Sequence, residues 1–266
     1  MRRGGILWGI ILLLAGVLFL LDNLGFLPIS AWTLIFPGAM ILIGLWLLLG
    51  PLVFRQVVES RNLSIPLDGV TGAVLKIRHG AGNLSVSSLA DNANLLSGTF
   101  VGGVEEKISR SGSRTDIKLR VPELEWWGFP SASSRDGLRW DLGINRGVSF
   151  SLDFKTGASK STLDLHDLII TDMRLETGAS DTIVFLPEQA GFTKADFQFG
   201  SARLELHIPE NVAAKIVVKG AMIDTAEIDQ NRFPRSGEEF CSPDFAAATN
   251  KVDIKIDAGV GKVIVH

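Results

Sequence analysis

The sequence predicts an all-β soluble domain, a single-stranded β-solenoid, that follows an α-helical transmembrane hairpin. One observation behind this prediction is a long apolar region before residue 55 that is almost free of charge. The other is a glycine turn that recurs in steps of 21, 22 and 20 residues, at Gly157, Gly178, Gly200 and Gly220. A fixed period of about 21 residues is typical of a solenoid, in which stacked coils bury one continuous core.

The composition excludes several classes of function. The net charge is −3 over 266 residues, so the chain lacks the basic excess that nucleic-acid binding requires. The single cysteine, Cys241, excludes an intrachain disulfide and a cysteine metal cluster. We expect Cys241 to be a small buried or loop residue, and a reactive thiol is the alternative.

The apolar region, residues 1–55, has room for two membrane-spanning helices, at about 4–21 and 31–54. The first of these spans holds no charged residue, and its length as a helix is about 27 Å, close to the thickness of a hydrocarbon core. The alternative is a signal peptide that begins at Arg2 and Arg3. No small-x-small cleavage site follows, however, and a second apolar span comes directly afterwards.

The distribution of basic residues predicts how the hairpin is oriented. Arg2 and Arg3 precede the first span and Arg55 follows the second, whereas the loop between the spans has no basic residue. The positive-inside rule therefore predicts that both termini are cytoplasmic. Small residues allow close packing within the hairpin or between copies in a homo-oligomer. The predicted packing face comprises Gly5, Gly9, Gly16, Gly38 and Gly44.

After a linker at 56–62, residues 63–266 follow the period-two pattern of half-buried strands, as in Val252–Asp257. Two stretches interrupt the repeat, at 122–147 and 229–249. The first is rich in tryptophan and arginine, which are favoured at binding hot spots. We therefore predict a partner-contact surface there, and the alternative is a loop whose aromatic rings pack on the solenoid. The predicted contact residues are Trp126, Trp127, Phe129, Arg139 and Trp140.

No residue pattern predicts a catalytic, cofactor or metal site. The run Gly157–Thr162 resembles a phosphate loop but lacks the glycine before its lysine. The histidines are far apart: His166 and His207 are expected to lie two coils from each other, about 10 Å, too far to share a zinc ion. Glycoside hydrolysis needs paired carboxylates in a cleft, which the sequence does not predict. The candidate carboxylates are Asp164, Asp167, Asp172 and Glu176.

Two parts of the sequence resemble known bacterial families. The run Gly9–Asn23, followed by Trp32, Phe36-Pro37-Gly38 and Ile43–Trp46, is similar to the membrane region of LiaI/LiaF-like proteins. The glycine-rich runs Gly80–Val86 and Ala258–Val263 resemble the C-terminal domain of LiaF-like envelope-stress proteins and the related toast-rack or adhesin-like β-solenoids.

The resemblance implies a non-enzymatic protein of the bacterial cell membrane that senses or modulates cell-envelope stress. Its partners would be the lipid bilayer and a membrane sensor kinase, contacted through the helices and the solenoid surface. The alternative is a structural or adhesive scaffold module exposed outside the membrane. A carbohydrate-active enzyme, a third hypothesis, would need a cleft of close carboxylates.

Overall fold

The computed structural model divides the chain into two compact units, residues 1–57 and 58–266. The residues it describes are 36–37, 40–41, 44, 60–122, 138–220 and 226–266. In the first unit the described residues have helical backbone: Phe36, Pro37, Met40, Ile41 and Gly44. No helix among the described residues is long and apolar enough to cross a bilayer. The rest of the predicted hairpin lies outside the described residues.

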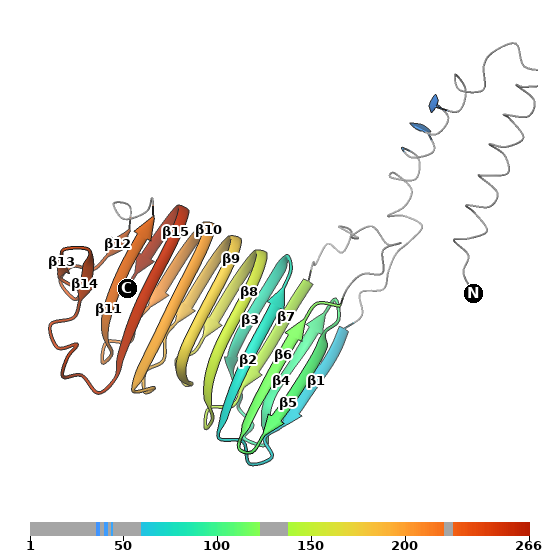
Figure 1. Ribbon diagram of the computed structural model, residues 1–266, viewed down its shortest axis with the longest axis horizontal. Coiled ribbons are helices and arrows are strands. Elements are labelled where there is room, and N and C mark those ends of the chain that lie inside the picture. The colour runs from blue at the N-terminus through green and yellow to red at the C-terminus, as the bar shows by residue number, and fades with distance from the viewer. Residues whose placement is uncertain (1–35, 38–39, 42–43, 45–59, 123–137, 221–225) are drawn as a thin grey trace, which may run out of the picture. The chain divides into compact units, whose positions relative to one another are not determined.

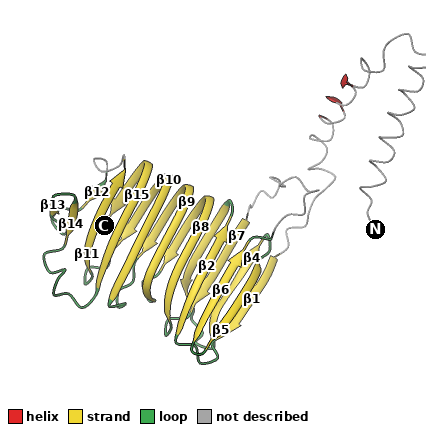
Figure 2. Ribbon diagram, in the orientation of Figure 1, coloured by secondary structure: helices red, strands yellow, loops and turns green. Residues whose placement is uncertain are grey.

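The described part of the second unit is all β, which confirms the predicted class. Its fifteen strands belong to one continuous sheet (Figures 1 and 2). The strands are β1 (Ser60–Pro66), β2 (Gly72–His79), β3 (Gly82–Ser88), β4 (Asn94–Val101), β5 (Glu105–Ser111), β6 (Arg114–Arg120), β7 (Leu138–Ile144), β8 (Ser149–Asp164), β9 (Ile169–Phe185), β10 (Phe192–His207), β11 (Ala213–Gly220), β12 (Glu227–Ile228), β13 (Arg235–Ser236), β14 (Glu239–Cys241) and β15 (Lys251–Val265).

Each long strand serves both sides of the solenoid because it turns a corner at a glycine. Along β8 the inside–outside alternation changes phase at Gly157 and Ala158, two consecutive exposed residues. The part of β8 before the corner pairs with β2, and the part after it pairs with β3. We call these two parts of the sheet the entry face and the return face. Apolar side chains from both faces point inward and form a single core.

The coils stack in parallel register through the middle of the molecule (Figure 1). Leu152 of β8 faces Met173 of β9, 21 residues later, and Leu175 faces Phe197 of β10, 22 residues later. The predicted period therefore holds from β8 to β10. The order on the entry face is β5-β6-β2-β8-β9-β10-β15-β11-β14-β13, and the order on the return face is β1-β4-β7-β3-β8-β9-β10-β15-β12.

The corner glycines lie directly above one another and form a glycine column: Gly80, Gly157, Gly178, Gly200 and Gly259. A Cβ atom on Gly259 would lie 2.5 Å from the carbonyl oxygen of Gly200, and one on Gly200 would lie 2.8 Å from that of Gly178. Such contacts are shorter than a carbon and an oxygen tolerate. Close approach between coils is therefore what requires glycine at the corner.

The fourth predicted step, from Gly200 to Gly220, does not connect neighbouring coils. Strand β15 lies between β10 and β11, so the corner next to Gly200 belongs to Gly259, 59 residues later. Gly220 lies beside Ala258 on the far side of β15. Strand β11 therefore precedes β15 in the sequence, although β15 lies between β10 and β11 in the sheet.

Charges on the outer side of the entry face match this strand order. Lys194 of β10 and Lys215 of β11 both face Asp253 of β15. If β10 and β11 were neighbours in the same register, the two lysines would face each other, and like charges opposite each other destabilise a sheet. The next row of paired residues across these strands also alternates in charge, through Asp153 of β8, Arg174 of β9, Asp196 of β10 and Lys255 of β15.

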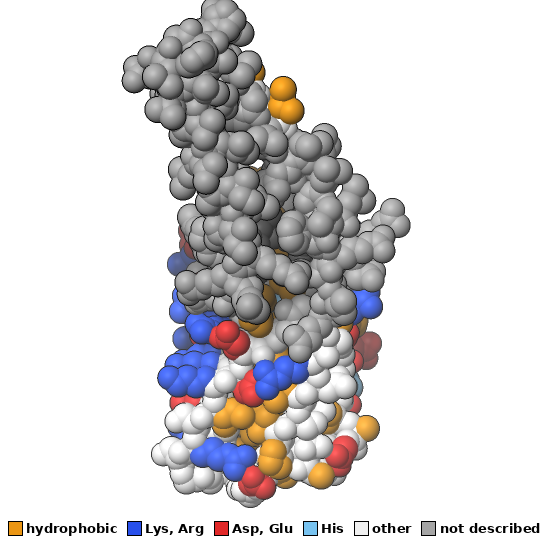
Figure 3. All heavy atoms as spheres, turned by 90° about the vertical axis from the view of Figure 1, so that its right-hand side faces the viewer, with side chains coloured by type: hydrophobic (Ala, Val, Ile, Leu, Met, Phe, Trp, Pro, Cys, Tyr) orange, Lys and Arg blue, Asp and Glu red, His pale blue; other side chains and the backbone are white. Residues whose placement is uncertain are grey.

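Antiparallel strands are found at both ends of the stack. At one end β14 pairs antiparallel with β11, and β13 pairs with β14. At the other end β5 pairs with β6, and β1 and β4 follow β7. Viewed from this second end, the described surface shows hydrophobic side chains between charged ones (Figure 3). Short or charged edge strands of this kind limit pairing with another chain.

Parts of the predicted linker and insertions form regular strands. Ser60–Asn62, expected in the linker, pair with β4. Residues 138–144, expected within the first insertion, form β7 and alternate buried and exposed positions. The second expected insertion, 229–249, contains β13 and β14.

The glycine column gives a first prediction. Replacing Gly259→Ala should lower the free energy of unfolding by about 1–3 kcal/mol, because the backbone of two coils must move apart. Urea denaturation of the full chain, followed by circular dichroism, measures the loss. Gly72→Ala is the matched control, since the nearest atom to its added Cβ lies at 3.6 Å, an ordinary contact. Equal stability of Gly259→Ala and the parent chain would contradict the packing role of the column.

Candidate functional site

The predicted contact surface is divided by the structure. Trp126, Trp127 and Phe129 lie outside the described residues. Arg139 is exposed on the outer side of β7. Trp140, the next residue, points inward and is fully buried, so its side chain belongs to the core and not to an exposed contact surface. Of the predicted packing face, Gly44 is described, and its backbone is helical.

Trp140 packs against two rings inside the solenoid. Its ring meets those of Phe100 and His79 edge to face, each at a centroid distance of 5.1 Å. Neither ring nitrogen of His79 has a hydrogen-bond partner among the described residues, nor does the indole nitrogen of Trp140. Burial without a partner disfavours the charged imidazolium, and it lowers the pKa of His79 to about 4.

The carboxylates considered for glycoside hydrolysis do not share a cleft. Glu176 lies on the entry face, where Lys155 and Arg174 contact its two oxygens at 2.6 Å and 2.8 Å. Asp164 is exposed at the end of the return face. Glu176 and Asp164 therefore point away from opposite faces of the solenoid. Asp153 is likewise paired: Arg78 donates to both of its oxygens, and this bonding lowers the pKa of the carboxyl.

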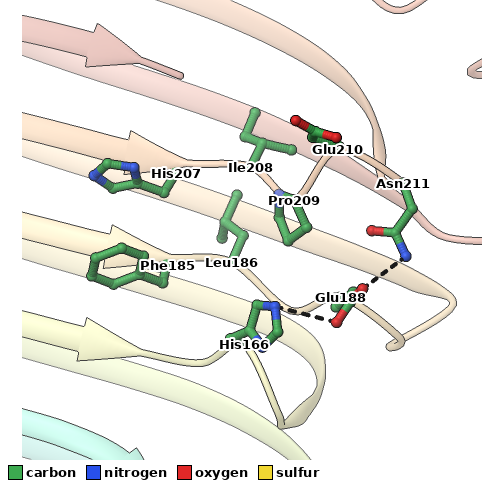
Figure 4. A pocket seen from close by; sticks show the side chains of 9 residues that line it. All are labelled: His166, Phe185, Leu186, Glu188, His207, Ile208, Pro209, Glu210 and Asn211. Atoms are coloured by element: carbon green, nitrogen blue, oxygen red, sulfur yellow. Dashed lines mark hydrogen bonds and ion pairs between the residues drawn. The ribbon is translucent and has the colours of Figure 1, made fainter.

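A hollow lies at the rim where the return face of one coil turns into the entry face of the next (Figure 4). This rim pocket has a volume of about 480 Å³. Glu188 is one of the residues that line this pocket. Its Oε2 lies 3.2 Å from His166 Nε2, and its Oε1 accepts a hydrogen bond from the Asn211 amide at 3.1 Å. Such an arrangement can hold a small polar group or water, and it contains no evident nucleophile–base pair.

A row of stacked rings runs from the rim pocket along the stack. Phe185 at the end of β9 stacks on His207 at the end of β10, with 4.5 Å between the ring centroids. His207 in turn stacks on His266, which follows β15, at 4.8 Å. Glu205, two residues before His207, lies beside both histidines, with Oε1 3.1 Å from His207 Nε2 and 3.6 Å from His266 Nε2.

The sequence pattern did not predict this cluster. The solenoid period pairs His207 with His166, at a distance too long to share a metal ion. The true neighbour of His207 is His266, because β15 lies next to β10. The alternation in Val252–Asp257 indicated a strand, but no local feature placed that strand beside β10.

Comparisons with known proteins identify the fold. A family described as the N-terminal domain of toast_rack, DUF2154, matches residues 54–207. No curated protein matches the chain. Two solved structures do.

One is described as a "putative cell adhesion protein" from Clostridium sporogenes, with a TM-score of 0.69 and 15% identity over 78% of this chain and 98% of that one. The other is described as a "putative adhesin" from Bacteroides fragilis. It covers 80% of this chain and 98% of that one at 8% identity, and its TM-score of 0.22 is too low to support an argument. At this identity the Clostridium structure shows a shared fold.

His79 gives a prediction about pH. Its pKa is about 4 in the folded protein and about 6.5 in an unfolded chain. The unfolded chain therefore binds a proton that the folded chain does not, and stability should fall as the pH drops from about 6.5 to about 4, by up to roughly 3 kcal/mol. Urea denaturation at several pH values measures this slope.

The variant His79→Phe should lose that part of the pH dependence while keeping an aromatic ring against Trp140. His166→Phe is the control, since His166 is exposed. An identical pH slope in the parent chain and His79→Phe would show that His79 does not resist protonation.

Proposed function

The chain belongs to the toast-rack family, and from this premise we propose that it is a non-enzymatic β-solenoid module that acts through protein–protein contacts at a bacterial membrane. The observation that carries the proposal is the way the stack ends. Both ends continue into antiparallel strands, among them β14 and β13 at one end and β5 at the other. Capped ends favour a module of fixed length that presents its faces and rim to a partner.

The charged faces support a binding role over a catalytic one. Their ionic groups pair with one another across strands, as in Arg78 with Asp153 and Lys155 with Glu176. Groups that are already paired are poor general acids and bases, but a patterned charged surface gives specificity in protein recognition.

Membrane attachment rests on the N-terminal unit. Its described helical residues expose large apolar side chains: Phe36 is 66% exposed, Met40 62% and Ile41 68%. Apolar surface of this kind needs lipid or a packed partner to cover it. This supports an apolar helix within the predicted second span, 31–54. The cytoplasmic placement of both termini rests instead on Arg2, Arg3 and Arg55 and the positive-inside rule.

By resemblance to LiaF-like proteins, the contacts would sense or modulate cell-envelope stress, with a membrane sensor kinase as the partner. The runs that carry this resemblance lie in the apolar segment and at the glycine corners. The second candidate is an adhesive or structural module outside the membrane. The fold shared with the Clostridium protein, described as one of cell adhesion, favours it.

Photocrosslinking in living cells tests the partner. A photoreactive amino acid is placed at Gly16, in the predicted packing face, and at Arg139, exposed on β7. We expect a crosslink to one membrane sensor kinase that changes in yield when the cell envelope is stressed. The control position is Arg110, exposed on the edge strand β5. The absence of any membrane-protein crosslink from either test position in stressed cells would contradict the proposal.

A topology measurement separates the two candidates. In a Cys241→Ser background, a single cysteine is introduced at Lys255→Cys, an exposed position of the entry face. The proposed cytoplasmic orientation protects this thiol from a membrane-impermeant maleimide in intact cells and exposes it after lysis. Labelling in intact cells would instead favour the adhesive module.

A further inference from the structure

Three side chains of metal-binding type converge where β10 and β15 end. Glu205, His207 and His266 each offer one donor atom, and the three atoms lie within 4.8 Å of one another. The two separations that involve the carboxylate are 3.1 Å to His207 and 3.6 Å to His266. Glu205 is partly buried, with 21% of its side chain exposed, and His207 is 33% exposed. His266 is 54% exposed, so two of the three ligands are partly buried and the third lies at the surface.

These separations fit a transition-metal ion. Two ligands of a tetrahedral zinc ion, each about 2.0–2.1 Å from the metal, lie about 3.3 Å apart. The two distances from the carboxylate to the imidazoles fall on either side of that value. The two imidazole rings stack nearly parallel at 4.8 Å, so His266, which is 54% exposed, must turn out of the stack to face the same ion. We propose that Glu205, His207 and His266 form a binding site for a divalent transition metal, with Zn²⁺ as the reference ion. The ion would replace the hydrogen bond between Glu205 Oε1 and His207 Nε2.

The ligand set indicates which class of ion binds. Imidazole nitrogen suits zinc, copper and nickel, whereas calcium and magnesium prefer oxygen ligands. Two histidines and one carboxylate leave at least one coordination position open for water. The rim pocket, which His207 also lines, provides space for that water (Figure 4).

Neighbouring residues hold the ligands in place. Phe185 stacks on His207 at an interplanar angle of 15° and limits rotation of its ring. Arg203 Nη2 lies 3.4 Å from Oε2 of Glu205, the oxygen that does not face the histidines. That contact leaves Oε1 facing the site. Residues that orient the ligands in this way commonly surround a metal site.

Metal binding would join two segments that are distant in sequence. Glu205 and His207 come from β10, and His266 follows β15, the strand inserted between β10 and β11. An ion at this place would fasten the last strand of the chain to the middle of the solenoid. The inference is independent of the partner-contact proposal, since it concerns the chain alone.

Zinc binding to the full chain, purified in detergent and stripped of metal with a chelator, tests the inference. Isothermal titration calorimetry should show saturable binding of one Zn²⁺ per chain, and Zn²⁺ should raise the midpoint of thermal unfolding. The variants His207→Ala, His266→Ala and Glu205→Gln should each weaken binding at least tenfold. Circular dichroism checks that each variant is folded, and Glu205→Gln preserves the shape of the side chain.

The matched control is His166→Ala, which removes another half-exposed histidine of the same rim and should leave the affinity unchanged. Cobalt gives a second readout, because Co²⁺ in a site with histidine ligands absorbs visible light, and the cluster variants should lose that band. The inference is overturned if no saturable zinc binding occurs. It is also overturned if the three cluster variants bind as tightly as the parent chain, or if His166→Ala loses binding to the same extent.

Discussion

The position of β15 between β10 and β11 is the constraint on which most of the described C-terminal half depends. Hydrogen bonding alone would allow β10 and β11 to pair directly. Two features favour the observed order. Asp253 separates Lys194 from Lys215, and Gly259 continues the glycine column where a Cβ atom would meet the carbonyl oxygen of Gly200. Charge order on the outside and close approach at the corner select the same neighbour.

That single placement has consequences at both margins of the sheet. It leaves β11 as the last long coil on the entry face, where β14 pairs with it and ends the parallel stack. It also brings His266 onto His207, beside Glu205, and so creates the one described group of three metal-binding side chains. The cluster is a product of topology, because its members come from segments 59 residues apart.

Local sequence patterns predicted the parts of this fold that depend on local structure. Alternation identified the strands, and the glycine intervals gave the corners of β8, β9 and β10. Gly220 was assigned to the next coil because spacing cannot reveal a strand inserted from later in the chain. Trp140 was predicted to belong to a partner-contact surface because of the composition around it, although Leu142 and Ile144 alternate with it as buried residues of β7. The group of Glu205, His207 and His266 was missed for the same reason that Gly220 was misplaced.

Disulfide formation between paired cysteines tests the strand order most directly. In a Cys241→Ser background, Gln198→Cys with Asp257→Cys places the two cysteines opposite each other on adjacent strands. Their Cα atoms are about 4.8 Å apart, within the Cα–Cα limit of about 7 Å for a disulfide. Gln198→Cys with Lys219→Cys places them two strands apart, at about 9.6 Å. We expect rapid oxidation of the first pair and none of the second. Oxidation of the second pair alone would mean that β10 and β11 are neighbours, and it would contradict the account.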